Sequence, residues 1–173
     1  MDQRPKNSVK SRNCKIWMFG DDINTDLIVP SKYLTERDPD VIVRHTLESV
    51  DPEFAPNVSP GDIIVAGKNF GSGSSREEAV FVFKELGIQT IIAESFARIF
   101  YRNCFNLGIP AILLPNALEQ LKGHQFVAMD LDAGQLQTDQ TTLMFKPLPP
   151  FLIEMVQAGG ALALLCKKRQ DCS

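Results

Sequence analysis

The residues best suited to chemistry lie in one glycine-rich segment, Asn69–Glu77, with the sequence NFGSGSSRE. Two adjacent hydroxyls, from Ser74 and Ser75, are followed directly by the guanidinium of Arg76. The planar fork of an arginine suits a carboxylate or a phosphate, because two parallel N–H groups can bind two oxygens at once. The segment therefore indicates an anion-binding site.

This segment stands where a strand is expected to meet a helix. Ser74 and Glu77 match a capping box, which predicts that Ser74 is the N-cap of a helix over Arg76–Leu86. Gly71 and Gly73 permit backbone conformations that a residue with a Cβ resists. The first amides of such a helix, and its dipole, favour an anion. A plainer interpretation is a well-capped helix with an exposed arginine, but the glycines and the preceding strand favour the anion site.

Two familiar phosphate-binding loops are excluded. A P-loop needs Gly-Lys-Ser or Gly-Lys-Thr at the helix start, and this helix opens with Ser-Ser-Arg. A dinucleotide fingerprint needs a third glycine where this chain has Arg76. That glycine allows the helix to pack closely on the strand, which an arginine would prevent.

The middle of the chain has the pattern β-α-β-α-β. Its short connections predict parallel strands joined by right-handed crossovers, and therefore an α/β fold. Ligands bind such sheets beyond the carboxyl ends of the strands, which is where Asn69–Glu77 lies. The expected strands are Asp62–Ala66, Gln89–Ala93 and Ile109–Leu114, and the expected helices are Arg76–Leu86, ended by Gly87, and Ser95–Leu107, ended by Gly108.

The segments on either side of this core are shorter and less regular. We expect residues 1–14 to form a flexible N-terminal arm and residues 15–173 to form a single domain. Before the core, the expected elements are a strand at Lys15–Phe19, a turn at Gly20–Asp26, a polar loop at Ser31–Asp38, a helix at Pro39–Val50 and an irregular stretch at Asp51–Pro60. After it, they are a short helix at Ala117–Gly123, strands at Phe126–Leu131 and Thr141–Phe145 around a turn at Asp132–Gly134, a helix at Phe151–Ala158, an apolar segment Ala161–Cys166 docked on the core, and a solvated tail.

Composition excludes several classes of protein. The chain of 173 residues is 44% hydrophobic and 23% charged, with a formal net charge of −3, as in an ordinary water-soluble globule. This charge gives no general attraction to nucleic acid or membrane, and the apolar stretches are too short to span a bilayer. The polar N-terminus has no apolar core like that of a secretory signal, so we expect a cytoplasmic protein.

The cysteines and histidines give no sign of a cofactor site. The spacing of the four cysteines contains no CxxC pair, so a self-contained zinc or iron–sulfur site is not expected in this chain. Reduced, partly buried thiols are the expectation, and the two histidines are interpreted as structural or surface residues. These residues are Cys14, Cys104, Cys166, Cys172, His45 and His124.

Three longer motifs together carry a family resemblance. They are GDDINTDLIVPSKYL, GDIIVAGKNFGSGSSREEA and IIAESFARIFYRNCFNLGIPAILL, and the later PPFLIEMVQAGG agrees with them. In order and spacing they resemble the small subunit of 3-isopropylmalate dehydratase, a swivel domain of the aconitase superfamily, over nearly the whole chain from about Lys15. The motifs do not separate this family from the small subunits of homoaconitase or 2,3-dimethylmalate dehydratase.

The resemblance implies a swivelling β/β/α domain that works beside a separate large subunit, as a heterodimer or heterotetramer. In that family the large subunit holds a [4Fe–4S] cluster, and the small subunit supplies a serine base and groups that bind the substrate's carboxylates. The implied reaction is the isomerisation of 2-isopropylmalate to 3-isopropylmalate, a hydro-lyase step of leucine biosynthesis.

The resemblance also assigns roles to particular residues. Ser74 matches the catalytic serine, and Arg76 and Ser75 match its carboxylate-binding neighbours. Thr25 and Asp26 match an active-site turn, and Arg37 falls in the loop that contacts the variable group of the substrate. The sequence departs from the common family pattern in having Ser72 in place of a cysteine and Glu78 in place of a histidine.

Two other functions remain open on the residues alone. One is a stand-alone enzyme that uses the glycine-rich loop to hold a phosphorylated small molecule. The other is a non-catalytic regulatory or scaffold domain that has kept the fold. Binding of an iron–sulfur partner distinguishes the first of these from a hydro-lyase subunit, and activity of the assembled pair distinguishes the second.

Overall fold

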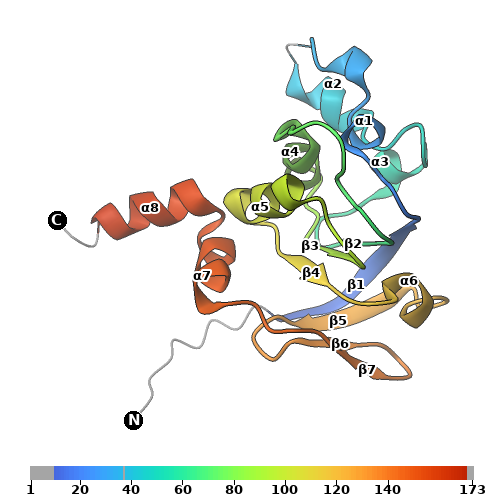
Figure 1. Ribbon diagram of the computed structural model, residues 1–173, viewed down its shortest axis with the longest axis vertical. Coiled ribbons are helices and arrows are strands. Elements are labelled where there is room, and N and C mark those ends of the chain that lie inside the picture. The colour runs from blue at the N-terminus through green and yellow to red at the C-terminus, as the bar shows by residue number, and fades with distance from the viewer. Residues whose placement is uncertain (1–9, 37, 171–173) are drawn as a thin grey trace.

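A seven-stranded sheet forms the centre of the computed structural model, which describes residues 10–36 and 38–170, with side chains from residue 14 onwards (Figure 1). The strand order is β4-β3-β2-β1-β5-β6-β7. The strands are β1 (Lys10–Phe19), β2 (Ile63–Ala66), β3 (Thr90–Ala93), β4 (Ala111–Leu113), β5 (Phe126–Asp130), β6 (Gln135–Gln137) and β7 (Thr142–Met144).

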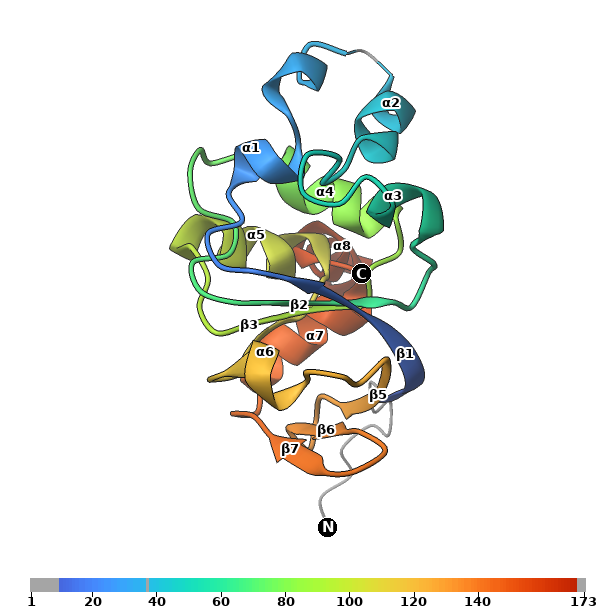
Figure 2. The same cartoon turned by 90° about the vertical axis from the view of Figure 1, so that its right-hand side faces the viewer.

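The parallel half of the sheet confirms the predicted β-α-β-α-β core. Strands β1, β2, β3 and β4 pair in parallel, with α4 (Glu78–Glu85) between β2 and β3 and α5 (Arg98–Leu107) between β3 and β4. Every residue of β2 and β3 is buried, as expected for parallel strands covered on both faces. Figure 2 shows α4 and α5 lying together on one side of these strands.

The antiparallel half contains a strand that sequence analysis missed. Strand β5 pairs with β1, β6 with β5, and β7 with β6, all antiparallel. The predicted turn after Leu131 therefore joins β5 to β6 and not to the strand near Met144. Strand β6 reads Gln-Leu-Gln, with only Leu136 buried, and so short a polar segment gives little strand signal.

Strand β1 begins at Lys10, five residues before the predicted start, so residues 10–14 belong to the sheet and not to a flexible arm. Lys10 is opposite Asp130 of β5, whereas Ile16–Phe19 pairs with β2 on the other side. The polar start of β1 thus has its partner far away in the sequence. Residues 1–9 of the predicted arm lie outside the described residues.

The helices flanking the core also differ in length from the predictions. They are α1 (Thr25–Ile28), the 3-10 turn η1 (Ser31–Tyr33), α2 (Pro39–Arg44), α3 (Phe54–Asn57), α6 (Ala117–Gln120), α7 (Pro150–Ala158) and α8 (Ala161–Gln170). Helix α2 ends well before the predicted Val50. Leu47, fully buried with a φ of 58°, donates its N–H to the carbonyl of Ile28, and this tertiary bond redirects the chain.

The C-terminal segment contradicts the prediction that Ala161–Cys166 docks on the core. Helix α8 continues to Gln170, none of its residues is buried, and Leu162 is 74% exposed. In Figure 1 it projects away from the sheet beyond α7. Among the described residues no single helix is long and apolar enough to cross a membrane, and only the pair α7 and α8, bent by 87°, meets that test when the two are combined.

A cluster of aromatic rings fixes the base of the glycine-rich loop. Phe70 is 1% exposed and contacts the rings of Phe83, Phe96 and Phe100. Gly71, the next residue, has a φ of +76°, and a Cβ there would lie 2.0 Å from Cγ of Phe100. The close approach of the loop backbone to α5 therefore requires glycine.

Replacing Gly71 by alanine should destabilise the fold by about 2 to 4 kcal/mol, combining a positive φ with an overpacked core. Thermal and urea unfolding of the isolated chain would measure the loss. The matched control is Gly20→Ala, because a Cβ at Gly20 meets no atom within 4 Å. The control should change stability by less than about 1 kcal/mol. Equal stability of the two variants would show that the contact with Phe100 does not limit the loop.

Candidate active site

The glycine-rich loop after β2 is bound along its length to the loop after β1. Gly67 N–H donates to the Gly20 carbonyl at 3.2 Å, and Asp22 N–H donates to the Lys68 carbonyl at 2.8 Å. Further on, Gly71 N–H donates to Ile23 O at 2.7 Å and Thr25 N–H to Ser72 O at 2.8 Å. The two predicted active-site motifs therefore form one surface beyond the carboxyl ends of the parallel strands.

Side-chain hydrogen bonds also connect the loops that follow β1, β2 and β3. Asn69 has a φ of 60° and Asp22 a φ of 57°, and Asn69 Nδ2 donates to Asp22 Oδ1 at 2.9 Å. Asp21 Oδ1 accepts from Lys68 N at 2.7 Å, and Ser95 Oγ, after β3, accepts from Asn69 N at 2.8 Å. Sequence analysis placed Asp21, Asp22 and Asn69 within the two motifs but gave no individual role to them or to Ser95.

Ser74 lies in the exposed part of this loop, and the predicted capping box does not form. Helix α4 begins at Glu78, Glu77 occupies the N-cap position, and no side chain caps the helix. Gly73, with a φ of +96°, turns the chain immediately before Ser74. Ser74 is therefore held four residues before the helix, with its side chain outside the core.

Thr25 fixes the backbone of Ser74 from the opposite loop. It is 1% exposed, and its Oγ1 donates to the carbonyl of Ser74 at 3.2 Å. A buried hydroxyl in this position holds the loop. The geometry gives Thr25 a positioning function, and its direct contact with substrate stays a prediction.

Arg76 pairs with Asp26, which brings two of the predicted residues together. Arg76 Nη1 lies 2.6 Å from Asp26 Oδ1, and the arginine side chain is 19% exposed against 51% for the aspartate. Nη1 is nevertheless a buried atom without a hydrogen bond among the described residues. Within the described part of the chain, the other guanidinium nitrogens of Arg76 have no partner, so their donor capacity remains for an anion.

Asp26 is itself held by Ser31 at the start of the next turn. Ser31 Oγ donates to Asp26 Oδ1 at 2.8 Å. This hydrogen bond, together with the nearby charge of Arg76, keeps the pKa of Asp26 below its ordinary value. Asp26 is therefore ionised at neutral pH and orients the guanidinium beside the Ser74 loop.

For the two remaining predicted residues, Ser75 and Arg37, the described part of the structure gives no hydrogen bond or ion pair with the other site residues. Ser75 is exposed between Ser74 and Arg76, and its contact with substrate stays a prediction. Arg37 lies outside the described residues.

The thiols within residues 14–170 do not converge on a common point. Cys14 is buried and its Sγ donates to Gln89 Oε1 at 3.2 Å, Cys104 is fully buried, and Cys166 is exposed on α8. Burial raises the pKa of Cys104 far above its ordinary value. Among the described residues there is no group of three or more His, Cys, Asp or Glu side chains that could hold a metal.

The fold and the loop junction define an α/β domain that presents two hydroxyls and a guanidinium on an exposed edge of its sheet. The family described as the aconitase C-terminal domain matches residues 20–117, and the chain belongs to that family.

Comparison with individual proteins narrows the assignment to the 3-isopropylmalate dehydratase small subunits. The small subunit from Syntrophus aciditrophicus (strain SB) is 45% identical over 158 residues, which cover 90% of this chain and 96% of that protein. The one from Nautilia profundicola is 48% identical over 150 residues, covering 86% and 90%. A crystal structure of 3-isopropylmalate dehydratase from Methanocaldococcus jannaschii matches with a TM-score of 0.83 at 38% identity, over 94% of this chain and 96% of that one. The family and the α/β fold predicted from the motifs are confirmed.

Proposed function

We propose that this chain is the small subunit of a two-subunit hydro-lyase that converts 2-isopropylmalate to 3-isopropylmalate by dehydration and rehydration. The observation that carries the proposal is the junction of the two loops. It holds Ser74 on an exposed turn and places Arg76 beside it, in a chain with close relatives of this name.

In this mechanism Ser74 acts as the base. Its alkoxide takes a proton from the carbon next to a carboxylate, a double bond forms, and the hydroxyl on the neighbouring carbon departs as hydroxide. The proton now on Ser74 and the departed hydroxide together amount to the loss of one water. Water then adds back with the two positions exchanged. A serine can act in this way only if its alkoxide is stabilised, and the charge of Arg76 and the loop amides would provide that stabilisation.

Arg76 and Ser75 would bind the substrate carboxylate. The fork of Arg76 offers parallel donors, and Asp26 holds it from one side at 2.6 Å. Thr25 thus acts mainly by positioning Ser74, and Asp26 acts mainly by orienting Arg76.

The iron–sulfur cluster that this family implies does not fit the described thiols of this chain, which are buried apart or exposed on α8. We assign the [4Fe–4S] cluster to the large subunit, where it would supply a Lewis acid for the leaving hydroxyl. The partner is then a cluster-bearing large subunit, in a heterodimer or heterotetramer in the cytoplasm.

Reconstitution tests this function. The purified chain alone should contain no stoichiometric iron and no activity, and should become active when mixed with a cluster-loaded large subunit. Turnover of isopropylmalate, homocitrate and dimethylmalate by the pair would identify the substrate. Preference for one of the last two would favour homoaconitase or dimethylmalate dehydratase. Cysteine-dependent iron in this chain alone would contradict the two-subunit arrangement, and an inactive but stable pair would favour a scaffold.

A further inference from the structure

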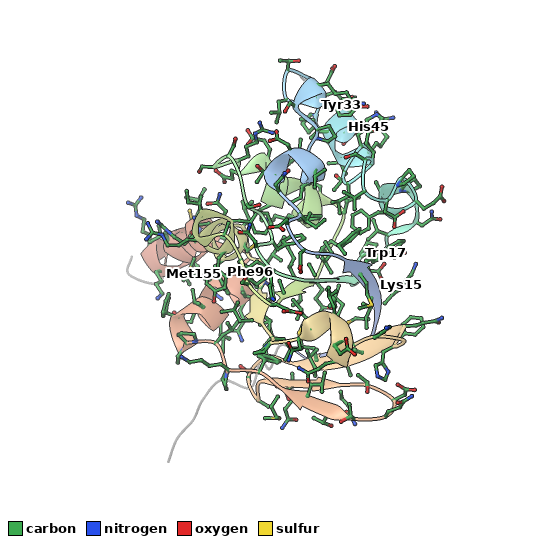
Figure 3. The ribbon with its side chains drawn as sticks, turned by 45° about the vertical axis from the view of Figure 1, so that its right-hand side comes forward. Lys15, Trp17, Tyr33, His45, Phe96 and Met155 are labelled. Atoms are coloured by element: carbon green, nitrogen blue, oxygen red, sulfur yellow. The ribbon has the colours of Figure 1, made fainter. Side chains whose placement is uncertain are left out.

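Four side chains beside the candidate site form one connected group, Lys32, Tyr33, His45 and Glu48, here called the Glu48 clamp. Lys32 and Tyr33 come from η1, and His45 and Glu48 follow α2. Figure 3 shows Tyr33 and His45 side by side at the end of the molecule that carries α1 and α2. None of these four residues has a part in the mechanism described above.

Glu48 is the centre of this group. Its Oε1 lies 2.7 Å from Lys32 Nζ, and its Oε2 lies 2.6 Å from His45 Nδ1 and accepts from the Tyr33 hydroxyl at 3.2 Å. The rings of Tyr33 and His45 stack with centroids 4.1 Å apart, and Lys32 Nζ lies 4.6 Å from the Tyr33 ring centroid. One carboxylate therefore holds two consecutive residues of η1 against the end of α2.

The segment that this clamp holds leads directly to the candidate site. Its turn is closed by N–H donation from Tyr33 to Pro30 O, from Leu34 to Ser31 O and from Glu36 to Tyr33 O. Ser31, at the start of the same turn, donates to Asp26, which pairs with Arg76. A change in the position of η1 would therefore move both the Ser31 contact and the residues that follow, Thr35 and Glu36.

Charge favours a clamp that is closed at neutral pH. The hydrogen bond from Lys32 is the main cause that lowers the pKa of Glu48, and contact with Glu48 raises the pKa of Lys32. Both groups are thus charged under ordinary conditions, and they attract each other.

We propose that Glu48 is a positioning residue for substrate selection, which fixes η1, Thr35 and Glu36 through Lys32 and Tyr33 next to the Ser31–Asp26–Arg76 contacts. This role rests on the proposed function, since selection has meaning only for an active pair. A positioning residue of this kind would affect the discrimination between substrates more than the shared chemical step.

The first test uses the isolated chain and needs no activity. In Glu48→Gln, hydrogen exchange at the amides of Tyr33, Leu34 and Glu36 should be about two- to fivefold faster than in the parent, the effect of losing a solvent-exposed ion pair. Tyr33→Phe, which keeps the ring and removes only the hydroxyl, should show a smaller change in the same direction. The matched control is Glu53→Gln, an exposed glutamate just before α3 whose side chain accepts a hydrogen bond from Asn57 of that helix.

The second test uses the reconstituted pair. Glu48→Gln should change the ratio of kcat/KM between isopropylmalate and dimethylmalate by at least about threefold, mainly through KM. The control should leave that ratio unchanged. Equal losses on both substrates, or exchange at the three amides no faster than in the control, would overturn the role of Glu48. If the parent pair lacks activity on every hydroxy acid while exchange responds as expected, the proposed function fails and the clamp remains as a structural device without a part in selection.

Discussion

Replacing Ser74 by alanine should lower the turnover of the reconstituted pair by at least about a thousandfold, the usual loss when an activated base is removed. Substrate binding should change much less, because Arg76 would still hold the carboxylate. The fold should also be preserved, since Ser74 is exposed and does not cap α4. We expect the free energy of unfolding to change by no more than about 0.5 kcal/mol, as for other exposed positions.

Ser59→Ala is the matched control, because Ser59 is an exposed serine that precedes β2 at the end opposite the glycine-rich loop. Both variants should bind the large subunit and unfold at the parent's temperature. Near-parental turnover in the Ser74 variant would remove this residue from the mechanism. Residual activity should respond to pH differently from that of the parent, since a different base would take the proton.

The central part of the fold was predictable because local signals and tertiary contacts agree there. The runs of isoleucine and valine at Ile63–Ala66 and Thr90–Ala93 are buried strands, and Gly87 and Gly108 end the helices with φ values of 75° and 85°. At these positions a short sequence pattern is enough to determine the backbone conformation.

Other elements were decided by contacts that the local sequence does not reveal. The capping-box pattern at Ser74 and Glu77 is genuine, but the bond from Thr25 and the positive φ of Gly73 hold that stretch outside the helix. Similarly, α8 has a sequence rich in alanine and leucine that suggested the core, yet Leu162 and Leu165 are exposed. Apolar composition by itself did not show whether this helix is buried or exposed.

The candidate site was partly predictable in the same sense. The motifs that contain Asp26 and Arg76 were each assigned to the site, but their separation of 50 positions gave no measure of distance, and the structure brings them to 2.6 Å. Ser31 and Glu48 were not found, because a single serine or glutamate in a polar loop has no distinctive pattern. Their importance comes from hydrogen bonds between elements, which only the folded chain defines.

Replacing Arg76 by lysine should not preserve function, although the charge is kept. A lysine ammonium lacks the planar pair of donors that binds both oxygens of a carboxylate, so substrate binding and the chemical step should both weaken. We expect kcat/KM to fall about 10- to 100-fold, the equivalent of one charge-assisted hydrogen bond. The loss should appear in KM as well as in kcat, which distinguishes it from the Ser74 variant.

Arg102→Lys provides the matched control, since Arg102 is an exposed arginine on α5. A second variant, Asp26→Asn, separates orientation from binding. It keeps a hydrogen-bond acceptor for Ser31 but removes the negative charge 2.6 Å from the guanidinium. If Asp26 orients Arg76, its replacement should lower kcat/KM, whereas a rise would show that Asp26 competes with the substrate for the arginine. Parental values of both kinetic constants in Arg76→Lys would mean that Arg76 is an ordinary surface residue beside α4.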